Sequence, residues 1–231
     1  MAAKRIRGPV IAIDGPSGAG KTTVSRLIAE KLAYKYFDTG AMYRALALSI
    51  DASGIDMDDG AAIEKFCRDA EISYDASSGK VSVNKVDYTG SIRTQKAGLL
   101  ASIIAKKSPV RKRLVQYQRA VGRDGYIVME GRDIGTVVFP DAEIKFFLDA
   151  SESARAKRRH TEIEPKDGGD IERTSMEIAE RDRRDKSRGN SPLKKADDAI
   201  YVDTTGLGLV EVVERLLGLI EDRLKPWEAE G

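Results

Sequence analysis

A phosphate-binding loop is the feature of this chain that most restricts its fold. Residues 15–22, GPSGAGKT, match the pattern G-x-x-x-x-G-K-[ST] at every fixed position. The apolar run 10–14 precedes the motif, and apolar residues at helical spacing follow it. This order of strand, loop and helix is the context that the motif requires, because phosphate binds to backbone N–H groups where the helix begins. We therefore expect a P-loop after a buried parallel strand.

The motif also predicts how ATP would bind. Its glycines let backbone amides approach the phosphates, and Lys21 is expected to contact the β- and γ-phosphates. The hydroxyl of Thr22 is expected to coordinate Mg²⁺, which makes this ion the predicted cofactor. The residues predicted to bind ATP are Gly15, Pro16, Ser17, Gly18, Ala19, Gly20, Lys21, Thr22 and Thr23.

Four further short apolar segments indicate buried strands. They are residues 34–38, 126–130, 144–149 and 199–203, and each ends at an acidic residue. Helical patterns lie between them and after the last one. The chain therefore predicts an α/β protein of the P-loop NTPase fold, with a five-stranded, doubly wound parallel sheet. Ligands of such sheets bind at the carboxyl ends of the strands.

Two segments interrupt the alternation of strands and helices. Polar and apolar residues alternate over 73–93, which predicts a small antiparallel insert. Residues 151–190 contain almost no large apolar side chain and many arginines. We expect two helices there, joined by a turn at 165–170, with a capping box of Thr174 and Glu177 at the start of the second.

Composition excludes several classes of protein. The chain has 39 Lys and Arg against 37 Asp and Glu, and this balance gives no argument for a nucleic-acid partner. Its single cysteine excludes an internal disulfide and fits a reducing compartment. The sequence has neither the apolar core of a signal peptide nor an apolar run long enough to span a membrane. We expect a cytoplasmic monomer with no membrane partner.

Two short motifs raise the possibility of a GTPase. Residues 84–87, NKVD, have the form of a guanine-binding loop, and residues 51–54 have the form D-x-x-G. A guanine-binding loop should follow a buried strand of the central sheet, whereas Asn84 interrupts the alternating pattern of the insert. Asp51 follows a helical pattern rather than a strand. We interpret both motifs as chance matches.

The arginines favour phosphoryl transfer between two phosphorylated ligands. Arg181, Arg184, Asp185 and Arg188 are spaced to share one helix face. Further arginines, such as Arg44 and Arg132, follow strand ends on the ligand side of the sheet. Guanidinium groups bind phosphate oxygens in pairs and neutralise the charge of a transferring phosphoryl group. Together with the P-loop, these residues predict a second phosphate site.

The chain resembles the bacterial cytidylate kinases, which are nucleoside monophosphate kinases, over nearly its whole length. The segments that carry this resemblance are IDGPSGAGK at 13–21, DTGAMYR at 38–44, SIRTQ at 91–95, GRDIGTVVFPDA at 131–142, FLDAS at 147–151, ERDRRD at 180–185 with Arg188, and PL at 192–193. The last three of these segments lie within or directly beside the arginine-rich stretch 151–190. The combination of the GRDIGTVVFP run with the R-D-x-x-D block is specific to that family.

The resemblance implies transfer of the γ-phosphoryl group of ATP to CMP or dCMP. It also assigns roles to side chains. Cytosine would be recognised by Ser102, Arg111 and Asp133, and the CMP phosphate would be held by Arg44, Arg132 and Arg188. Arg181 and Asp185 would contact the sugar, and Thr39 would keep a hydroxyl near the nucleotide. The predicted catalytic residues are Lys21, Arg132, Arg155, Arg159 and Arg181.

The resemblance further implies a single kinase domain over 8–225. Its core would comprise 8–70, 94–150 and 190–225, with an insert at 71–93 beside the monophosphate site and an arginine-rich lid at 151–189. Two alternatives remain open from the residues alone. The chain could be another P-loop kinase of small molecules, or a non-enzymatic module that binds ATP or nucleic acid. The arginines lack interleaved aromatic residues, which counts against a single-strand binding platform.

Overall fold

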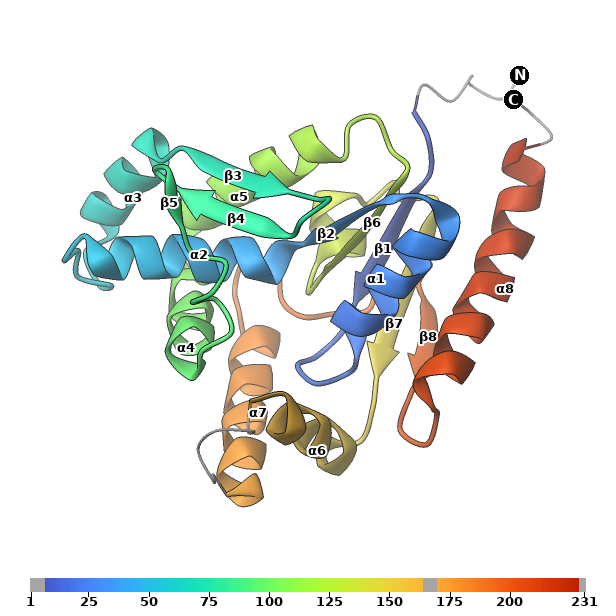
Figure 1. The fold of residues 1–231 in the computed structure, drawn as a ribbon. Coiled ribbons are helices and arrows are strands. Elements are labelled where there is room, and N and C mark those ends of the chain that lie inside the picture. The colour runs from blue at the N-terminus through green and yellow to red at the C-terminus, as the bar shows by residue number, and fades with distance from the viewer. Residues whose placement is uncertain (1–6, 164–169, 229–231) are drawn as a thin grey trace.

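The computed structural model describes residues 7–163 and 170–228 and contains the predicted parallel sheet (Figure 1). Its strand order is β2-β6-β1-β7-β8, and every neighbouring pair is parallel. The five strands are β1 (Val10–Asp14), β2 (Lys35–Asp38), β6 (Ile127–Gly131), β7 (Ile144–Asp149) and β8 (Ile200–Asp203). The predicted fold class and strand count are thus confirmed.

The central strand β1 is buried on both faces. Val10 and Ala12 belong to one hydrophobic core, whereas Ile11 and Ile13 belong to a second. Side chains of a strand alternate between its faces, so a continuous apolar run supplies both cores at once. The two cores are the physical basis of the doubly wound arrangement, because each face of the sheet needs its own layer of helices.

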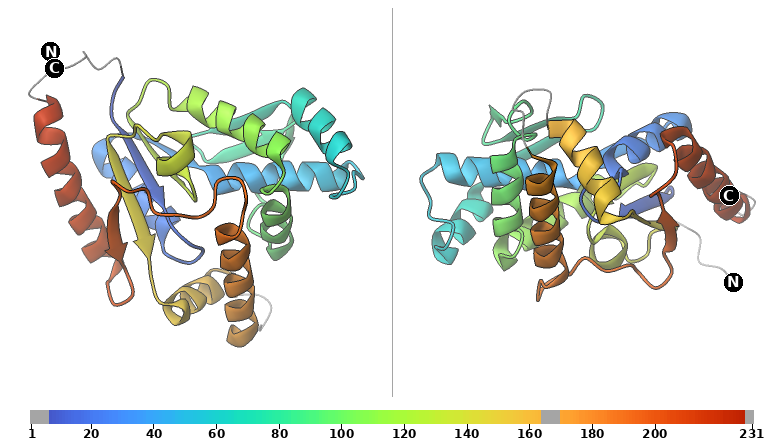
Figure 2. Two further views of the ribbon diagram at one scale, coloured as in Figure 1. Left: turned by 180° about the vertical axis from the view of Figure 1, so that it is seen from behind. Right: turned by 90° about the horizontal axis from the view of Figure 1, so that it is seen from below.

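Each core has its own set of helices (Figures 1 and 2). Helices α1 (Lys21–Leu32) and α8 (Leu209–Glu228) pack against each other and contribute Ile28 and Leu216 to the core around Ile11. The other core contains Leu46 of α2 (Thr39–Ala52) and Leu114 of α5 (Ser108–Val121), besides residues of α3 (Gly60–Asp69) and α4 (Gln95–Ile104). After β6 the chain forms a π-helical turn, η1 (Ile134–Val138).

The insert is antiparallel, as the sequence predicts. It consists of β3 (Ile72–Asp75), β4 (Lys80–Val83) and β5 (Val86–Asp87), and β4 contacts α2. Asn84 and Lys85 form the turn between β4 and β5, both with positive φ. The NKVD motif is therefore a hairpin turn of the insert, and Asp51 lies within α2. Both positions confirm that the GTPase-like motifs are chance matches.

The arginine-rich stretch forms α6 (Glu152–Ile163) and α7 (Ile171–Lys186), which pack against each other below the sheet in Figure 1. The predicted capping box is wrong. Asp170 is the N-cap of α7 and accepts a hydrogen bond from the Glu172 amide at 2.9 Å. Thr174 lies one turn inside the helix, because Asp170 offers a cap earlier in the chain. Most of the predicted turn at 165–170 lies outside the described residues.

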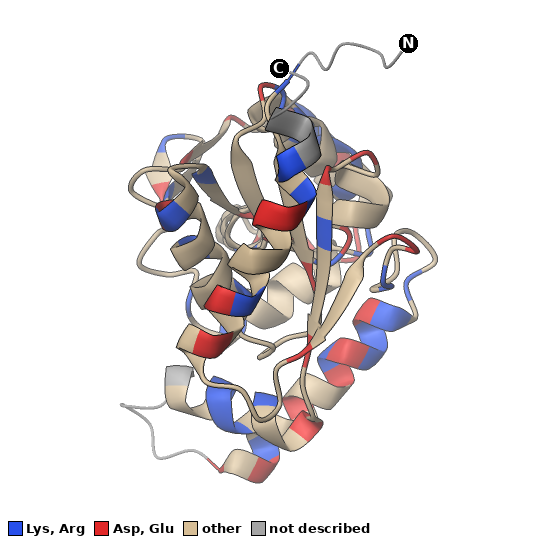
Figure 3. Ribbon diagram, turned by 90° about the vertical axis from the view of Figure 1, so that its right-hand side faces the viewer, with Lys and Arg blue, Asp and Glu red and all other residues tan. Residues whose placement is uncertain are grey.

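No helix in the described part of the chain is long and apolar enough to cross a membrane. Lysine and arginine are mixed with acidic residues along the helices, as Figure 3 shows for one side of the molecule.

Candidate active site at the carboxyl ends of the strands

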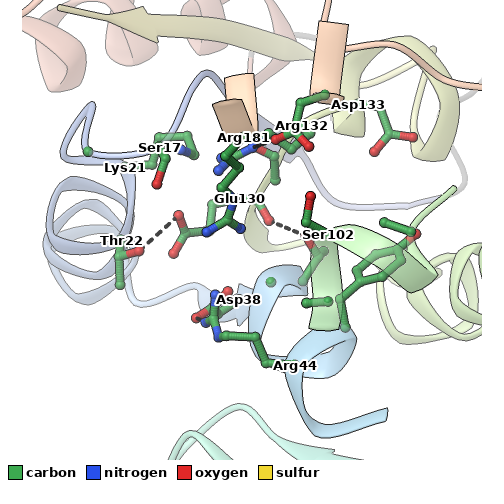
Figure 4. Close-up of a pocket in the computed structure, with 18 of the residues that line it drawn as sticks. Ser17, Lys21, Thr22, Asp38, Arg44, Ser102, Glu130, Arg132, Asp133 and Arg181 are labelled. Carbon is green, nitrogen blue, oxygen red and sulfur yellow. Dashed lines mark hydrogen bonds and ion pairs between the residues drawn. The ribbon is translucent and has the colours of Figure 1, made fainter. Parts of the chain in front are cut away.

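One cavity gathers most of the residues that the sequence predicts for the site (Figure 4). It lies at the carboxyl ends of β1, β2 and β6, where parallel strands present ligand-binding loops. Its lining includes these predicted residues: Ser17, Gly18, Gly20, Lys21, Thr22, Thr23, Thr39, Arg44, Ser102, Arg111, Arg132, Asp133, Arg159, Arg181, Asp185 and Arg188. Gly15, Pro16, Ala19 and Arg155 do not line it.

The P-loop supplies one end of this cavity. Gly18 and Gly20 have φ values of 76° and 85°, which a residue with a Cβ adopts only at a cost, and Gly20 is the N-cap of α1. Lys21 is buried, and its Nζ donates to the Pro16 carbonyl at 2.7 Å. Burial and the nearby Arg132 guanidinium lower the pKa of Lys21 to about 7. A bound phosphate would restore the charge of this ammonium group, because an anion favours the protonated form.

Glu130 is a site residue that the sequence reasoning missed. It lies at the carboxyl end of β6, only 3% exposed, and accepts hydrogen bonds from the Thr22 hydroxyl at 3.1 Å and the Tyr36 hydroxyl at 2.5 Å. Burial and the neighbouring Asp38 raise the pKa of Glu130 to about 7. Its position at a strand end was noted from the sequence, but nothing there showed that β6 lies next to the P-loop strand. The pairing of β1 with β6 supplies that information.

Arginine side chains line the middle of the cavity. Arg132 donates from Nη1 to the Gly15 carbonyl at 2.7 Å, and Arg44 pairs with Asp38 at 2.9 Å. Burial, and secondly Arg132, lower the pKa of Arg181 to about 9. The Nε atoms of Arg44, Arg181 and Arg188 are buried and have no hydrogen-bond partner in the described structure. The side chains of Arg44, Arg132, Arg181 and Arg188 line this one cavity, and such a concentration of cations suits an anionic ligand.

The far end of the cavity contains the residues that the resemblance assigns to the base. Arg111 and Asp133 form a buried ion pair. The hydroxyl of Ser102 is buried and has no partner within the described residues. Tyr43 on α2, which the sequence reasoning did not select, lines the same region. This end therefore offers a donor, an acceptor and a hydroxyl to a polar planar ligand.

Arg155 occupies a different place from the other predicted arginines. It is 4% exposed and lies beside the P-loop backbone, donating from Nη1 to the Ser17 carbonyl at 3.1 Å. It also donates from Nε to the Ala150 carbonyl at 3.0 Å and forms a buried ion pair with Asp182 of α7. Its predicted catalytic role remains a prediction, whereas its contacts hold α6 and α7 against the loop.

Comparison with known proteins identifies the family. Residues 11–222 match the family model described as cytidylate kinase. The cytidylate kinase of Citrifermentans bemidjiense is 44% identical over 227 residues, covering 97% of each chain. That of Geobacillus kaustophilus is 47% identical over 217 residues, covering 93% of this chain and 97% of the relative. A solved shikimate kinase from Acinetobacter baumannii is 17% identical, with a TM-score of 0.47 over 94% of this chain and 95% of that one, which is too remote to bear on the substrate. The chain belongs to the cytidylate kinase family.

Proposed function

We propose that this protein is an enzyme that transfers the γ-phosphoryl group of ATP to CMP or dCMP, giving ADP and CDP or dCDP. The observation that carries the proposal is the single cavity running from Lys21 and Thr22 to Arg111 and Asp133. A P-loop at one end suits a nucleoside triphosphate, and a buried polar set at the other suits a base. Full-length similarity to cytidylate kinases supports the same reaction.

ATP would bind to the P-loop, with its β- and γ-phosphates against the backbone amides and Lys21. Since α1 begins at Lys21, the positive end of its dipole faces the same phosphates. Arg159 lines the cavity on the lid side, where it could approach the triphosphate.

The residues present fit a magnesium ion. The Thr22 hydroxyl and the Glu130 carboxylate contact each other at 3.1 Å in the wall of the cavity. Mg²⁺ prefers oxygen ligands and keeps several waters, so one hydroxyl and one carboxylate suffice on the protein side. We propose that these two residues hold the ion. When bound, it would neutralise charge on the β- and γ-phosphates.

CMP would occupy the opposite end. The guanidinium groups of Arg44, Arg132 and Arg188, which line the cavity, would hold its phosphate. Ser102, Arg111 and Asp133 would recognise cytosine, and Arg181 and Asp185 would contact the sugar. Thr39 donates its hydroxyl to the Glu130 carbonyl at 2.7 Å, so its part at the nucleotide would be to fix this corner of the site.

The reaction needs positioning and charge neutralisation more than acid–base chemistry. An anionic oxygen of the CMP phosphate attacks the γ-phosphorus of ATP in line. A new P–O bond forms while the bond to the β,γ-bridging oxygen breaks, and ADP leaves. The attacking oxygen is already ionised at neutral pH, so no general base is required. Lys21 and the arginines stabilise the charge on the transferring group, a task suited to preorganised cations in a water-poor site.

The proposed domain organisation keeps 8–225 as one kinase domain, with an insert at 71–93 and a lid at 151–189. The insert contacts α2, which begins at the site, and the lid contributes Arg159, Arg181 and Asp185 to the cavity. A monomeric state and a cytoplasmic location remain predictions.

A coupled assay of ADP release tests the proposal. CMP, dCMP, UMP, AMP and GMP would be offered as acceptors with ATP, in the presence of Mg²⁺ and of EDTA. We expect Mg²⁺-dependent turnover with CMP and dCMP well above that with purine nucleotides. Turnover only with a non-nucleotide acceptor would identify another small-molecule kinase, and ATP binding without turnover would identify a non-enzymatic module.

A further inference from the structure

Tyr36 contacts Glu130 from the neighbouring strand. β2 and β6 pair in parallel, so that Tyr36 stands opposite Val128 and Asp38 opposite Glu130. The phenol reaches along the strand and donates to Oε1 of Glu130 at 2.5 Å, while the Thr22 hydroxyl donates to Oε2 at 3.1 Å. Each oxygen of this carboxylate therefore has one hydroxyl donor, and the two donors come from different elements.

This arrangement fixes the orientation of the Glu130 carboxylate. A glutamate side chain has several rotatable bonds, and its terminal torsion is broad when nothing restrains it. With Oε1 held by the phenol, Oε2 is left on the side of Thr22. Tyr36 is itself positioned by β2 and partly buried against the core around Ile11, so the restraint comes from a rigid element.

A second cavity makes the phenol important for excluding solvent. This cavity has a volume of about 640 Å³ and lies between α1, β2 and the turn of the insert. Tyr36 lines it, whereas Thr22 and Asp38 line both this cavity and the site. Removal of the hydroxyl would let water from this side compete for Glu130, and the carboxylate could then turn away from Thr22.

We infer that Tyr36 is a positioning residue for the magnesium site, acting through Glu130 to direct Oε2 toward the Thr22 hydroxyl. The inference rests on the proposed function, because it takes Thr22 and Glu130 as the residues that hold Mg²⁺. It assigns to Tyr36 no contact with either substrate. Residues that orient metal ligands typically contribute about 10- to 100-fold to metal affinity.

The test is a measurement of metal affinity rather than of turnover. Mn²⁺ replaces Mg²⁺ and is titrated into a mixture of protein and ADP. The protein is in excess over ADP, so that the nucleotide is bound, and free Mn²⁺ is measured by electron paramagnetic resonance. We expect Tyr36→Phe to weaken Mn²⁺ binding to the ADP complex about 10-fold. ADP affinity in EDTA should stay unchanged. An unchanged Mn²⁺ affinity in the folded variant would overturn the inference.

Tyr117→Phe is the matched control. Its hydroxyl accepts a hydrogen bond from the Tyr74 amide at 3.1 Å, and Tyr117 does not line the site. The same atom is therefore removed from a hydrogen-bonded phenol elsewhere in the fold. We expect the control to bind Mn²⁺ like the wild type. An equal loss in both variants would mean a general structural effect and would contradict the inference.

A double-mutant cycle shows whether Tyr36 acts through Glu130. Glu130→Gln should weaken Mn²⁺ binding, and adding Tyr36→Phe should then change it less than 2-fold, because the two side chains form one unit. Fully additive losses would contradict the mechanism. Glu130→Asp replaces Glu130→Gln in the cycle if the latter does not fold. Since no acceptor is present, these results are independent of whether CMP proves to be the substrate.

Discussion

Arg132 donates from Nε to Oδ2 of Asp185 at 2.9 Å, and this contact links the loop after β6 to helix α7. Arg188 donates to the other oxygen, and the carboxylate is 1% exposed. Burial alone would raise the pKa of Asp185, but Arg132 and Arg188 outweigh it and hold the pKa below its ordinary value. Asp185 therefore organises the arginines of the site, whatever else it contacts.

The sugar contact proposed for Asp185 is a separate prediction. A carboxylate oxygen can accept a second hydrogen bond, so a sugar hydroxyl could share it with an arginine. Loss of such a group costs about 1–3 kcal/mol, and we expect Asp185→Ala to lower kcat/KM for CMP by about 5- to 150-fold. Steady-state rates with CMP, dCMP and arabinosyl CMP should fall by different factors. The same factor for all three would restrict Asp185 to its role with the arginines.

Lys21→Met should abolish most turnover and leave the fold intact. Its ammonium group is the P-loop cation expected at the transferring phosphate, and removal of one preorganised donor costs about 2.7–4 kcal/mol. We expect kcat to fall at least about 100-fold in a steady-state assay, with an unchanged circular dichroism spectrum. Lys31→Met, at the exposed end of the same helix, is the control. More than about a tenth of the wild-type kcat in Lys21→Met would contradict this role.

Ser102→Ala should impair the base site with little effect on stability. The hydroxyl has no partner within the described structure, so its removal breaks no contact that the fold makes there. A hydrogen bond to the base would contribute about 1 kcal/mol, and we expect kcat/KM for CMP to fall about 5-fold while KM for ATP stays constant. Ser25→Ala removes another buried, unpartnered hydroxyl outside the cavity and should change neither quantity. An unaltered preference for CMP over UMP in Ser102→Ala would show that the Ser102 hydroxyl takes no part in base recognition.

Asp14 predicts a pH dependence of stability. Its carboxylate accepts the amides of Ile134 and Gly135, each at 2.8 Å, yet burial dominates and raises its pKa from 3.8 to about 7. Between these values the folded protein retains a proton that the unfolded chain releases, so the unfolding free energy falls as pH rises. One such group contributes at most about 1.4 kcal/mol per pH unit.

Denaturant titrations between pH 4.5 and 7.5 check this sign. The wild type should lose stability relative to Asp14→Asn as pH rises through that window, because the variant has no carboxyl group to ionise. Parallel curves for the two proteins would show that Asp14 titrates alike in the folded and unfolded states.

The sheet could be predicted from the sequence because its signals are local. A buried strand such as β1 needs a continuous apolar run, and a P-loop needs its glycines and its lysine at fixed spacing. The start of α7 was misplaced because Asp170 and Thr174 are both acceptable caps one turn apart. Propensity alone does not decide between two such residues.

The site was only partly predictable because its missing members depend on strand order. Glu130 and Tyr36 lie far apart in the chain and meet only because β6 pairs with both β1 and β2. The resemblance grouped Arg155 with Arg159, four residues later, yet only Arg159 lines the cavity. Helical spacing brings two such residues near one face, but the packing of α6 and α7 decides which of them reaches the ligand.

The contact of Arg155 with the Ser17 carbonyl has a consequence for the order of events in a catalytic cycle. Ser17 belongs to the loop that would receive ATP, and Asp182, on α7, accepts from its amide at 3.5 Å. If α6 and α7 move away from the loop, the hydrogen bonds of Arg155 and Asp182 to Ser17 must break, or the Ser17 backbone must move with the helices. If phosphate binding selects one conformation of this loop, it also favours the arrangement of α6 and α7 that fits that conformation. Nucleotide binding and the position of the two helices would then be thermodynamically linked.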